Sequence, residues 1–251
     1  MIRIERLYKS LGGQRVLRGV DLEIGRGEIL ALVGPSGTGK SVLLKHIIGL
    51  MQPDAGDVYV DGRSVGTASY RELTELRRRM GYVFQDGALL DSLTIRENLR
   101  LALDDESYLR DPSRGERRIE ESLALVNLDA IVQDKRPGEL SGGMRKRVGV
   151  ARAIIHRPEI ILYDEPTAGL DPRNVVHMDA LISRMRDRLG ATSVVITHDL
   201  GSVRRIADRV ALLLDGRIRF SGTAAEFFES RDPEVRLFTG QETEALLEVV
   251  E

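Results

Sequence analysis

The stretch "GPSGTGKS", Gly34 to Ser41, decides how this chain must fold. It matches the pattern G-x-x-x-x-G-K-[ST] residue for residue. The apolar run "EILALV" (28–33) precedes it, and the helical pattern "KSVLLKHII" (40–48) overlaps its end. A glycine-rich turn between a buried strand and a helix points successive backbone N–H groups at an anion, at the positive end of the helix dipole. We therefore predict a phosphate-binding loop within an α/β fold.

The residue types of this loop predict a nucleoside triphosphate as the ligand. Lys40 can bridge the β- and γ-phosphates, and the Ser41 hydroxyl can hold Mg²⁺. The strand before the loop and the helix after it argue against a chance match in a structural turn. The residues predicted to contact the nucleotide are Gly34, Pro35, Ser36, Gly37, Thr38, Gly39, Lys40, Ser41 and Val42.

A second apolar strand, "IILYDEP" at 160–166, supplies two adjacent carboxylates. Asp164 ends the buried run and is expected to face Mg²⁺ through a water, and Glu165 points the other way as a candidate general base. An apolar strand that ends in Asp-Glu is common by itself. Because this one follows a complete phosphate loop, we predict ATP hydrolysis as well as binding.

Two further polar residues end predicted strands. Gln85 closes "MGYVFQ" (80–85), and His198 closes "TSVVITH" (192–198). Because the carboxyl ends of parallel strands meet at one edge of a sheet, these side chains are expected near the nucleotide. Gln85 is predicted to coordinate Mg²⁺ or water, and His198 to reach the γ-phosphate or the attacking water. Each signal is weak alone, and the argument depends on their convergence.

A second glycine-rich helix entry, "LSGGM" at 140–144, raises the question of a second anion site. Ser141, Gly142 and Gly143 offer a hydroxyl and backbone N–H groups at a helix start. If this helix lies in an arm away from the core, the chain's own nucleotide is out of its reach. A two-fold dimer solves this, because each chain's second site can then contact the nucleotide bound by the other.

Composition limits the remaining possibilities. The 251 residues carry a net charge of −2, which gives no indication of nucleic-acid binding, and no cysteine, which excludes disulfides and thiolate metal sites. The start "MIRIERLYKS" contains no apolar core of a secretory signal. Because the longest apolar runs are strand-sized, we expect a soluble or peripheral protein.

The strand and helix patterns divide the chain. Helical patterns fill 86–157, and strand patterns lie on both sides, including a hairpin arm at 57–63 and an antiparallel edge at 216–222. We predict an α/β core of residues 1–85 and 158–229 that binds ATP and carries an antiparallel β part. Residues 86–157 form a helical subdomain, and 230–251 form a C-terminal tail.

Taken in order, these motifs resemble the ATP-binding subunits of ATP-binding-cassette (ABC) transporters over essentially the whole chain. The resemblance adds the stretch "AGLD" at 168–171. It implies a P-loop NTPase ABC-type ATPase core with an inserted helical subdomain, and ATP and Mg²⁺ as ligands. It also implies a head-to-tail homodimer that closes on two ATP molecules, with Asp171 in a loop that communicates across the dimer. The segment after Gln85 would contact a membrane partner.

Two residues depart from the family pattern. Met144 stands where the signature usually ends in Gln, which leaves the contacts of Ser141 and the backbone available. Leu11 stands where an aromatic residue usually stacks on adenine, and Tyr8 lies three residues upstream as a strand residue. The sequence therefore does not predict ring stacking on the base, and selectivity for ATP over GTP stays open.

Four stretches are similar to the phospholipid-trafficking subgroup of the Mla and Mkl type, of which "FQDGALLDSLTIRENL" (84–99) is the most specific. That resemblance implies an MlaE-like integral-membrane permease, an MCE-domain lipid carrier, in some cases a STAS-domain subunit, and a peripheral place on the cytoplasmic face of the inner membrane. A transporter for another substrate, or a soluble ABC ATPase that acts on ribosomes or DNA, is the alternative.

Two weaker patterns are a charged helix at 71–80, for which a solvated face is favoured over membrane contact, and an amphipathic tail carrying Leu246, Leu247 and Val250.

Overall fold

The computed structural model describes residues 1–103 and 111–240, so the tail pattern at 246–250 lies outside the described residues. Compactness divides the chain into two units. The first unit joins Met1–Leu73 to the described residues from Val194 onward, and the second is Thr74–Ser193. The division falls inside one strand, β8 (Thr192–Ile196). The motif-based boundaries of 1–85, 86–157 and 158–229 stay a prediction.

The first unit contains an antiparallel sheet of order β2-β1-β4-β5. Its strands are β1 (Ile2–Leu11), β2 (Gln14–Ile24), β4 (Ala55–Val60) and β5 (Arg63–Ser64). Alternate residues of β1, such as Ile2 and Ile4, are buried, which is the period-two pattern of a sheet with one covered face. The predicted hairpin at 57–63 is confirmed by the antiparallel pairing of β4 with β5.

The same unit holds the strand that leads into the phosphate loop. All five residues of β3 (Ile29–Val33) are buried, and β3 pairs parallel with β9 (Arg209–Leu214). β10 (Arg217–Thr223) then pairs antiparallel with β9, which confirms the predicted edge. Two helices follow strands here, α1 (Lys40–Ile47) after β3 and α8 (Leu200–Ile206) after β8. The parallel pair with its following helix is the α/β arrangement that the sequence predicts.

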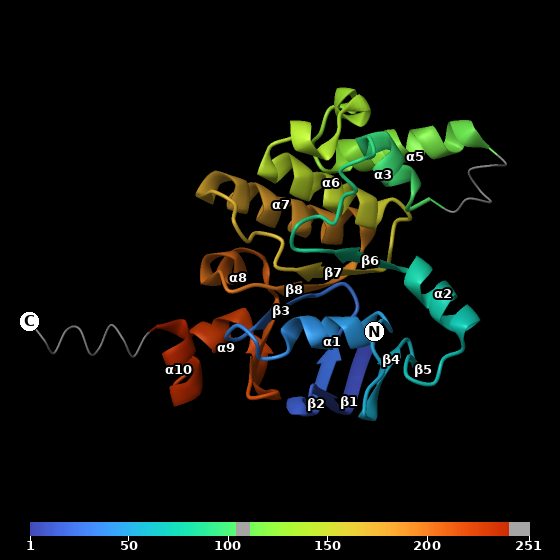
Figure 1. Cartoon of the computed structure of the whole chain (residues 1–251). Coiled ribbons are helices and arrows are strands. Elements are labelled where there is room, and N and C mark those ends of the chain that lie inside the picture. The colour runs from blue at the N-terminus through green and yellow to red at the C-terminus, as the bar shows by residue number, and fades with distance from the viewer. Residues whose placement is uncertain (104–110, 241–251) are drawn as a thin grey trace, which may run out of the picture. The chain divides into compact units, whose positions relative to one another are not determined.

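The described part of the C-terminal segment forms two short helices that join the core. These are α9 (Ala224–Phe228) and α10 (Pro233–Thr239), drawn at the red end of the colour range in Figure 1. Phe227 and Val235 are 0% and 1% exposed and belong to one apolar cluster with residues of β3 and β9. The Phe227 ring lies 5.4 Å from that of Phe220 and 5.3 Å from that of Phe228. The sequence pattern had not predicted this attachment.

The second unit combines a parallel strand pair with helices. β6 (Met80–Val83) pairs parallel with β7 (Ile160–Asp164), and α2 (Tyr70–Arg78) leads into β6. The described residues of 86–157 hold helices and no strand, as predicted. These helices are α3 (Ile95–Arg100), α5 (Pro112–Leu125), η1 (Ala130–Asp134), η2 (Pro137–Glu139) and α6 (Gly142–Ile154). α7 (Pro172–Leu189) follows β7.

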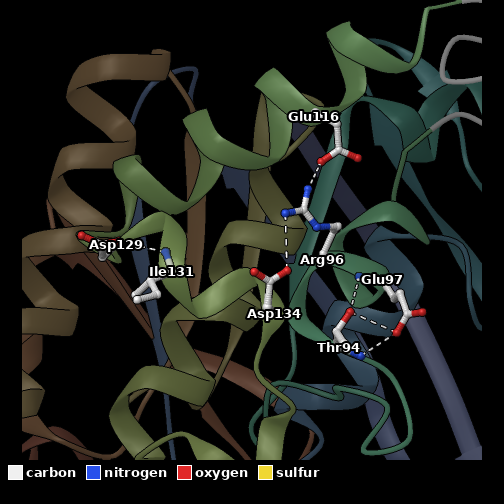
Figure 2. A network of polar contacts seen from close by, with 7 residues as sticks. All are labelled: Thr94, Arg96, Glu97, Glu116, Asp129, Ile131 and Asp134. Carbon is white, nitrogen blue, oxygen red and sulfur yellow. Dashed lines mark hydrogen bonds and ion pairs between the residues drawn. The ribbon is translucent and has the colours of Figure 1, made fainter.

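A polar network joins the helices α3, α5 and η1 of the second unit (Figure 2). The Arg96 guanidinium contacts the carboxylate of Glu116 on α5 and lies 3.5 Å from that of Asp134 on η1. Thr94 and Glu97 form a capping box that begins α3, with the Glu97 carboxylate accepting from the Thr94 N–H at 2.7 Å. These contacts fix the three helices as one packed group.

Within residues 1–103 and 111–240, each helix falls short of the length and apolar character that a bilayer crossing requires.

The C-terminal cluster gives a test of the fold. Replacing Phe227 by Ala removes a fully buried ring, and large-to-small changes of this kind cost about 3–5 kcal/mol. We expect the Phe227→Ala protein to unfold at a clearly lower temperature by circular dichroism. Leu50→Ala is the control, because the Leu50 side chain is 56% exposed and its loss should change stability by less than about 0.5 kcal/mol. Equal melting temperatures for the two variants would contradict the assigned packing.

Candidate nucleotide site

Glycines determine the path of the phosphate loop. Gly34, Gly37 and Gly39 have φ angles of 147°, 79° and 102°, values that residues with a Cβ rarely adopt. A Cβ on Gly34 would lie 2.3 Å from the Leu213 carbonyl oxygen. A Cβ on Gly39 would lie 2.8 Å from a methyl carbon of Val16. The backbone therefore curls where no side chain fits, which is the geometry that an anion-binding loop requires.

The two side chains at the start of α1 are held at this loop. The Lys40 ammonium donates to the carbonyl oxygens of Gly34 and Pro35, each at 2.8 Å, and Lys40 is only 6% exposed. Ser41 is half-buried in the first turn of the same helix. The loop glycines, the buried ammonium and the hydroxyl fit the phosphates and the Mg²⁺ of a nucleotide.

His198 lies in the turn between β8 and α8 of the same unit. It is exposed, and it follows the buried Thr197. The next residue, Asp199, caps α8 by accepting the Ser202 N–H at 3.1 Å. The fixed start of α8 therefore sets the backbone position of His198. Its contact with the γ-phosphate stays a prediction.

The residues near the expected base position are those of β1 and β2. Leu11 ends β1 and is 40% exposed. Tyr8 is 44% exposed, and its ring approaches Gly19 so closely that a Cβ there would lie 2.7 Å from the hydroxyl oxygen. Tyr8 is thus a strand residue packed over a glycine of its partner strand, as the sequence suggested. Selectivity for the base stays a prediction.

In the second unit, Asp164 has a partner that sequence analysis missed. The hydroxyl of Tyr82 on β6 donates to the Asp164 carboxylate at 2.9 Å. Burial raises the pKa of Tyr82, and the charge of Asp164 adds to that shift, so Tyr82 keeps its proton as a donor. The pairing follows from the register, since Tyr82 lies opposite Leu162 on the neighbouring strand. The only signal for this contact in the sequence was the Tyr82 hydroxyl, a polar group in the otherwise apolar run "MGYVF".

Glu165 begins a tight turn after β7. Its φ is 50°, in the left-handed region that non-glycine residues seldom occupy. The Ala168 N–H donates to the Glu165 carbonyl at 3.2 Å, and the Leu170 N–H donates to the Thr167 carbonyl at 3.1 Å. The Glu165 side chain in this turn is half-buried, and its role as general base stays a prediction.

Asp171 caps the next helix, α7. Its carboxylate accepts the N–H groups of Arg173 and Asn174 at 3.1 and 3.0 Å. These bonds, led by that of Asn174, hold the pKa of Asp171 below its usual value. A Cβ on Gly143 of α6 would lie 3.0 Å from the Asn174 side-chain oxygen, so this cap abuts the start of the signature helix.

The signature segment forms the predicted helix start. Ser141 is the N-cap of α6, and its hydroxyl accepts the Met144 N–H at 3.3 Å. Ser141 and Gly142 are exposed, and a Cβ on Gly142 would meet nothing within 4 Å. Ser141 and Gly142 are therefore accessible at the start of α6, whereas Gly143 is buried beside Asn174.

β6 ends at Val83, two residues before Gln85 and earlier than the sequence predicts, and Gln85 is exposed. The segment after it is fixed to α6 by backbone contact. A Cβ on Gly149 would lie 2.9 Å from the Cα of Gly87, and the Arg152 guanidinium donates to the carbonyls of Gly87 and Ala88 at 3.0 and 2.7 Å. Coordination of Mg²⁺ or water by the Gln85 side chain stays a prediction.

The predicted residues thus divide between the units. Lys40, Ser41 and His198 belong to the first unit, and Gln85, Ser141, Asp164 and Glu165 to the second. No group of three or more His, Cys, Asp or Glu in the described ranges could hold a metal ion. The assignment of Ser41, Gln85 and Asp164 to Mg²⁺ stays a prediction.

Comparison with known proteins identifies relatives along most of the chain. A family model described as ABC transporter matches residues 17–168. The probable ribonucleotide transport ATP-binding protein mkl of Mycobacterium tuberculosis H37Rv is 40% identical over 94% of this chain and 66% of its own length. Protein TRIGALACTOSYLDIACYLGLYCEROL 3 of Arabidopsis thaliana is 40% identical over 95% and 73%. The lipoprotein-releasing system ATP-binding protein LolD of Bacteroides thetaiotaomicron is 42% identical over 87% and 99%. The chain thus spans less than two thirds of the mycobacterial relative.

A solved structure extends these matches to the fold. The cassette MJ0796, a dimer in a post-hydrolysis state bound to ADP and Pi, superposes with a TM-score of 0.78. It is 32% identical and covers 89% of this chain and 99% of its own. The α/β ATPase fold predicted from the sequence is therefore confirmed.

Two predictions follow from the geometry of the site. The first concerns Gly39, where Ala would combine an unfavourable φ with a clash against Val16. We expect Gly39→Ala to weaken binding of a fluorescent ATP analogue at least about tenfold, since a loop shift of 1 Å can cost about 100-fold. Gly27→Ala is the matched control, because Gly27 also has a positive φ of 75° but no neighbour within 4 Å of an added Cβ. Similar affinities for both variants would show that the close approach is unimportant.

The second prediction concerns the Tyr82 hydroxyl. Replacing Tyr82 by Phe removes the donor that orients Asp164 and keeps the ring. Loss of a group that hydrogen-bonds to a metal ligand typically lowers metal affinity about 10–100-fold. The Mg²⁺ concentration for half-maximal ATP hydrolysis should therefore rise about tenfold. Nucleotide affinity measured without Mg²⁺ should stay unchanged. A Mg²⁺ titration that matches the unmodified protein would remove Asp164 from the metal site.

Proposed function

Because this chain belongs to the ABC transporter family and is an ABC-type ATPase, we propose that it powers phospholipid transport between membranes. ABC ATPases bind ATP, use Mg²⁺, dimerise and work with membrane permease subunits. In this proposal the partners are an MlaE-like permease and an MCE-domain lipid carrier, with a STAS-domain subunit as an additional candidate. The chain then lies at the cytoplasmic face of the inner membrane, held there by the permease.

The residues divide the work of hydrolysis as follows. Lys40 and the loop glycines hold the phosphates, and Ser41, Gln85 and Asp164 hold Mg²⁺, the last through a water. Glu165 accepts a proton from the attacking water, and His198 orients that water or the γ-phosphate. Mg²⁺ contributes charge neutralisation on the phosphate oxygens when it is bound.

The second glycine-rich helix entry completes this site in a dimer. Ser141, Gly142 and Gly143 contact the nucleotide bound by the partner copy, in a head-to-tail arrangement that closes on two ATP molecules. The exposure of Ser141 and Gly142 at the start of α6 is the observation that supports this role, and Gly143 is buried there. The dimeric state of MJ0796 supports the arrangement by likeness.

The segment at 84–99 is the observation that carries the choice of lipid. Asn98 is fully buried there, accepting the Leu90 N–H at 2.8 Å and donating to the Leu90 carbonyl at 3.1 Å. The loop is thereby fixed while the Leu90 side chain stays 50% exposed, as a permease contact requires. The sequence of this segment resembles the phospholipid-trafficking subgroup.

The relatives give this choice partial support. The Arabidopsis relative is named for a galactolipid, trigalactosyldiacylglycerol, and the Bacteroides relative is named for lipoprotein release. The mycobacterial relative is named for probable ribonucleotide transport, which makes a ribonucleotide transporter the competing outcome.

Replacing Glu165 by Gln tests the ATPase assignment. The change keeps the shape of the side chain and removes the base, so turnover should fall at least about 100-fold while ATP affinity is retained. Single-turnover hydrolysis and nucleotide binding measure the two effects separately. Unchanged turnover would show that another group accepts the proton.

The same variant, tagged and expressed at native level, tests the cargo. Membranes solubilised gently in ATP and Mg²⁺ are analysed by mass spectrometry for proteins and lipids that co-purify, with Lys40→Ala as the control that lacks nucleotide. A multi-span permease with an MCE-domain protein and phospholipid supports lipid transport. A different permease, or bound ribonucleotide, retains the ATPase and rejects the lipid. Ribosomes or nucleic acid reject transport altogether.

A further inference from the structure

Lys146 joins two segments that carry the candidate catalytic residues of the second unit. It lies in the second turn of α6, five residues after the N-cap Ser141, and it is half-buried. Its ammonium donates a hydrogen bond to the Ala168 carbonyl oxygen. Ala168 closes the turn that begins at Glu165, through its own N–H bond to the Glu165 carbonyl at 3.2 Å.

Charge favours this position of the ammonium. Burial lowers the pKa of Lys146, and the carboxylates of Asp86 and Glu165 oppose that shift by favouring its charged form. One cation therefore faces the acidic residue that follows Gln85 and the candidate base. These are the two charged groups that act on it from the segments packed against α6.

The turn that Lys146 contacts needs external support. Glu165 holds a left-handed φ of 50°, a conformation that persists only where surrounding contacts enforce it. The Ala168 bond is internal to the turn and does not tie it to another element. Lys146 supplies a tie to α6, which also contacts Gly87 and Ala88 through Gly149 and Arg152.

We propose that Lys146 is a positioning residue that couples the signature end of α6 to the Glu165 carboxylate in the same chain. A displacement of α6, set by contact of Ser141 with the partner's nucleotide, is passed to the Glu165 turn and to the segment after Gln85. The base is thereby aligned when the signature is engaged. This inference rests on the proposed function, because it assigns the base role to Glu165.

Three variants separate positioning from a general loss of stability. Lys146→Met keeps the aliphatic stem and removes the charge and the donor, and Lys146→Arg keeps both. Arg147→Met is the matched control, since Arg147 is also half-buried on α6 and also donates to a carbonyl, that of Asn127 at 2.9 Å. That bond lies away from the Glu165 turn, so its loss tests the cost of an equivalent contact.

The kinetic result expected is a split between turnover and binding. Lys146→Met should lower kcat of the dimer about tenfold or more, with nucleotide affinity within about twofold of the unmodified protein, since misplacement of a catalytic group acts on the reacting step. Lys146→Arg should restore most of the turnover, and Arg147→Met should keep it. Unchanged kcat in Lys146→Met, or equal losses in Lys146→Met and Arg147→Met, would overturn the proposal.

Hydrogen–deuterium exchange distinguishes failure of this inference from failure of the proposed function. In Lys146→Met, the Ala168 amide should exchange about tenfold faster than in the unmodified protein, because its turn has lost the tie to α6. Exchange there should be unaltered in Arg147→Met. If exchange rises but Glu165→Gln leaves hydrolysis intact, the positioning is real and the base is misassigned. If exchange at Ala168 stays the same, Lys146 does not position the turn, whatever the kinetics show.

Discussion

The first unit depends on one steric constraint, the absence of side chains where the phosphate loop passes its neighbours. Gly34 lies against the backbone of Leu213 on β9, and Gly39 lies against Val16 on β2. Val16 in turn has its carbonyl 2.4 Å from the place of a Cβ on Gly216, in the turn that joins β9 to β10. The loop is thus confined by the two strands β9 and β2, and its N–H groups belong to a backbone that cannot easily relax.

In the second unit, polar atoms near the candidate chemistry are held by donors from neighbouring elements. Tyr82 donates to Asp164, and Lys146 donates to the turn that carries Glu165. Each donor comes from a different element from its acceptor, so β6 contacts the Asp164 carboxylate and α6 contacts the turn that begins at Glu165. Such support matters because a catalytic carboxylate acts only within a narrow range of positions.

Contiguous motifs were predictable from the sequence, and contacts between distant residues were not. The phosphate loop, the helix start at Ser141 and the edge strand β10 follow from local patterns, since glycine, capping and alternation act over a few residues. The Tyr82–Asp164 bond and the burial of Val235 depend on strand register and on helix docking. A single sequence does not encode either in its local periodicity. The sequence predicted an antiparallel β part within 1–85 and a strand at Tyr8, but it did not assign the bounds of β1 and β2, whose pairing is interrupted by register shifts.

The departures from the family pattern fall on side chains, whereas most of the predicted phosphate contacts come from the backbone. Met144 is half-buried, and its N–H is the group that Ser141 caps, so the helix start forms without the usual Gln. Leu11 changes what the base can stack on and leaves the loop at Gly34–Ser41 untouched. Because main-chain N–H groups carry most of the recognition of phosphate, substitutions of this kind change selectivity and rate before they abolish binding. The helix start at Ser141 therefore forms with Met144 in the signature, and the loop glycines lie against Leu213 and Val16 rather than against Leu11.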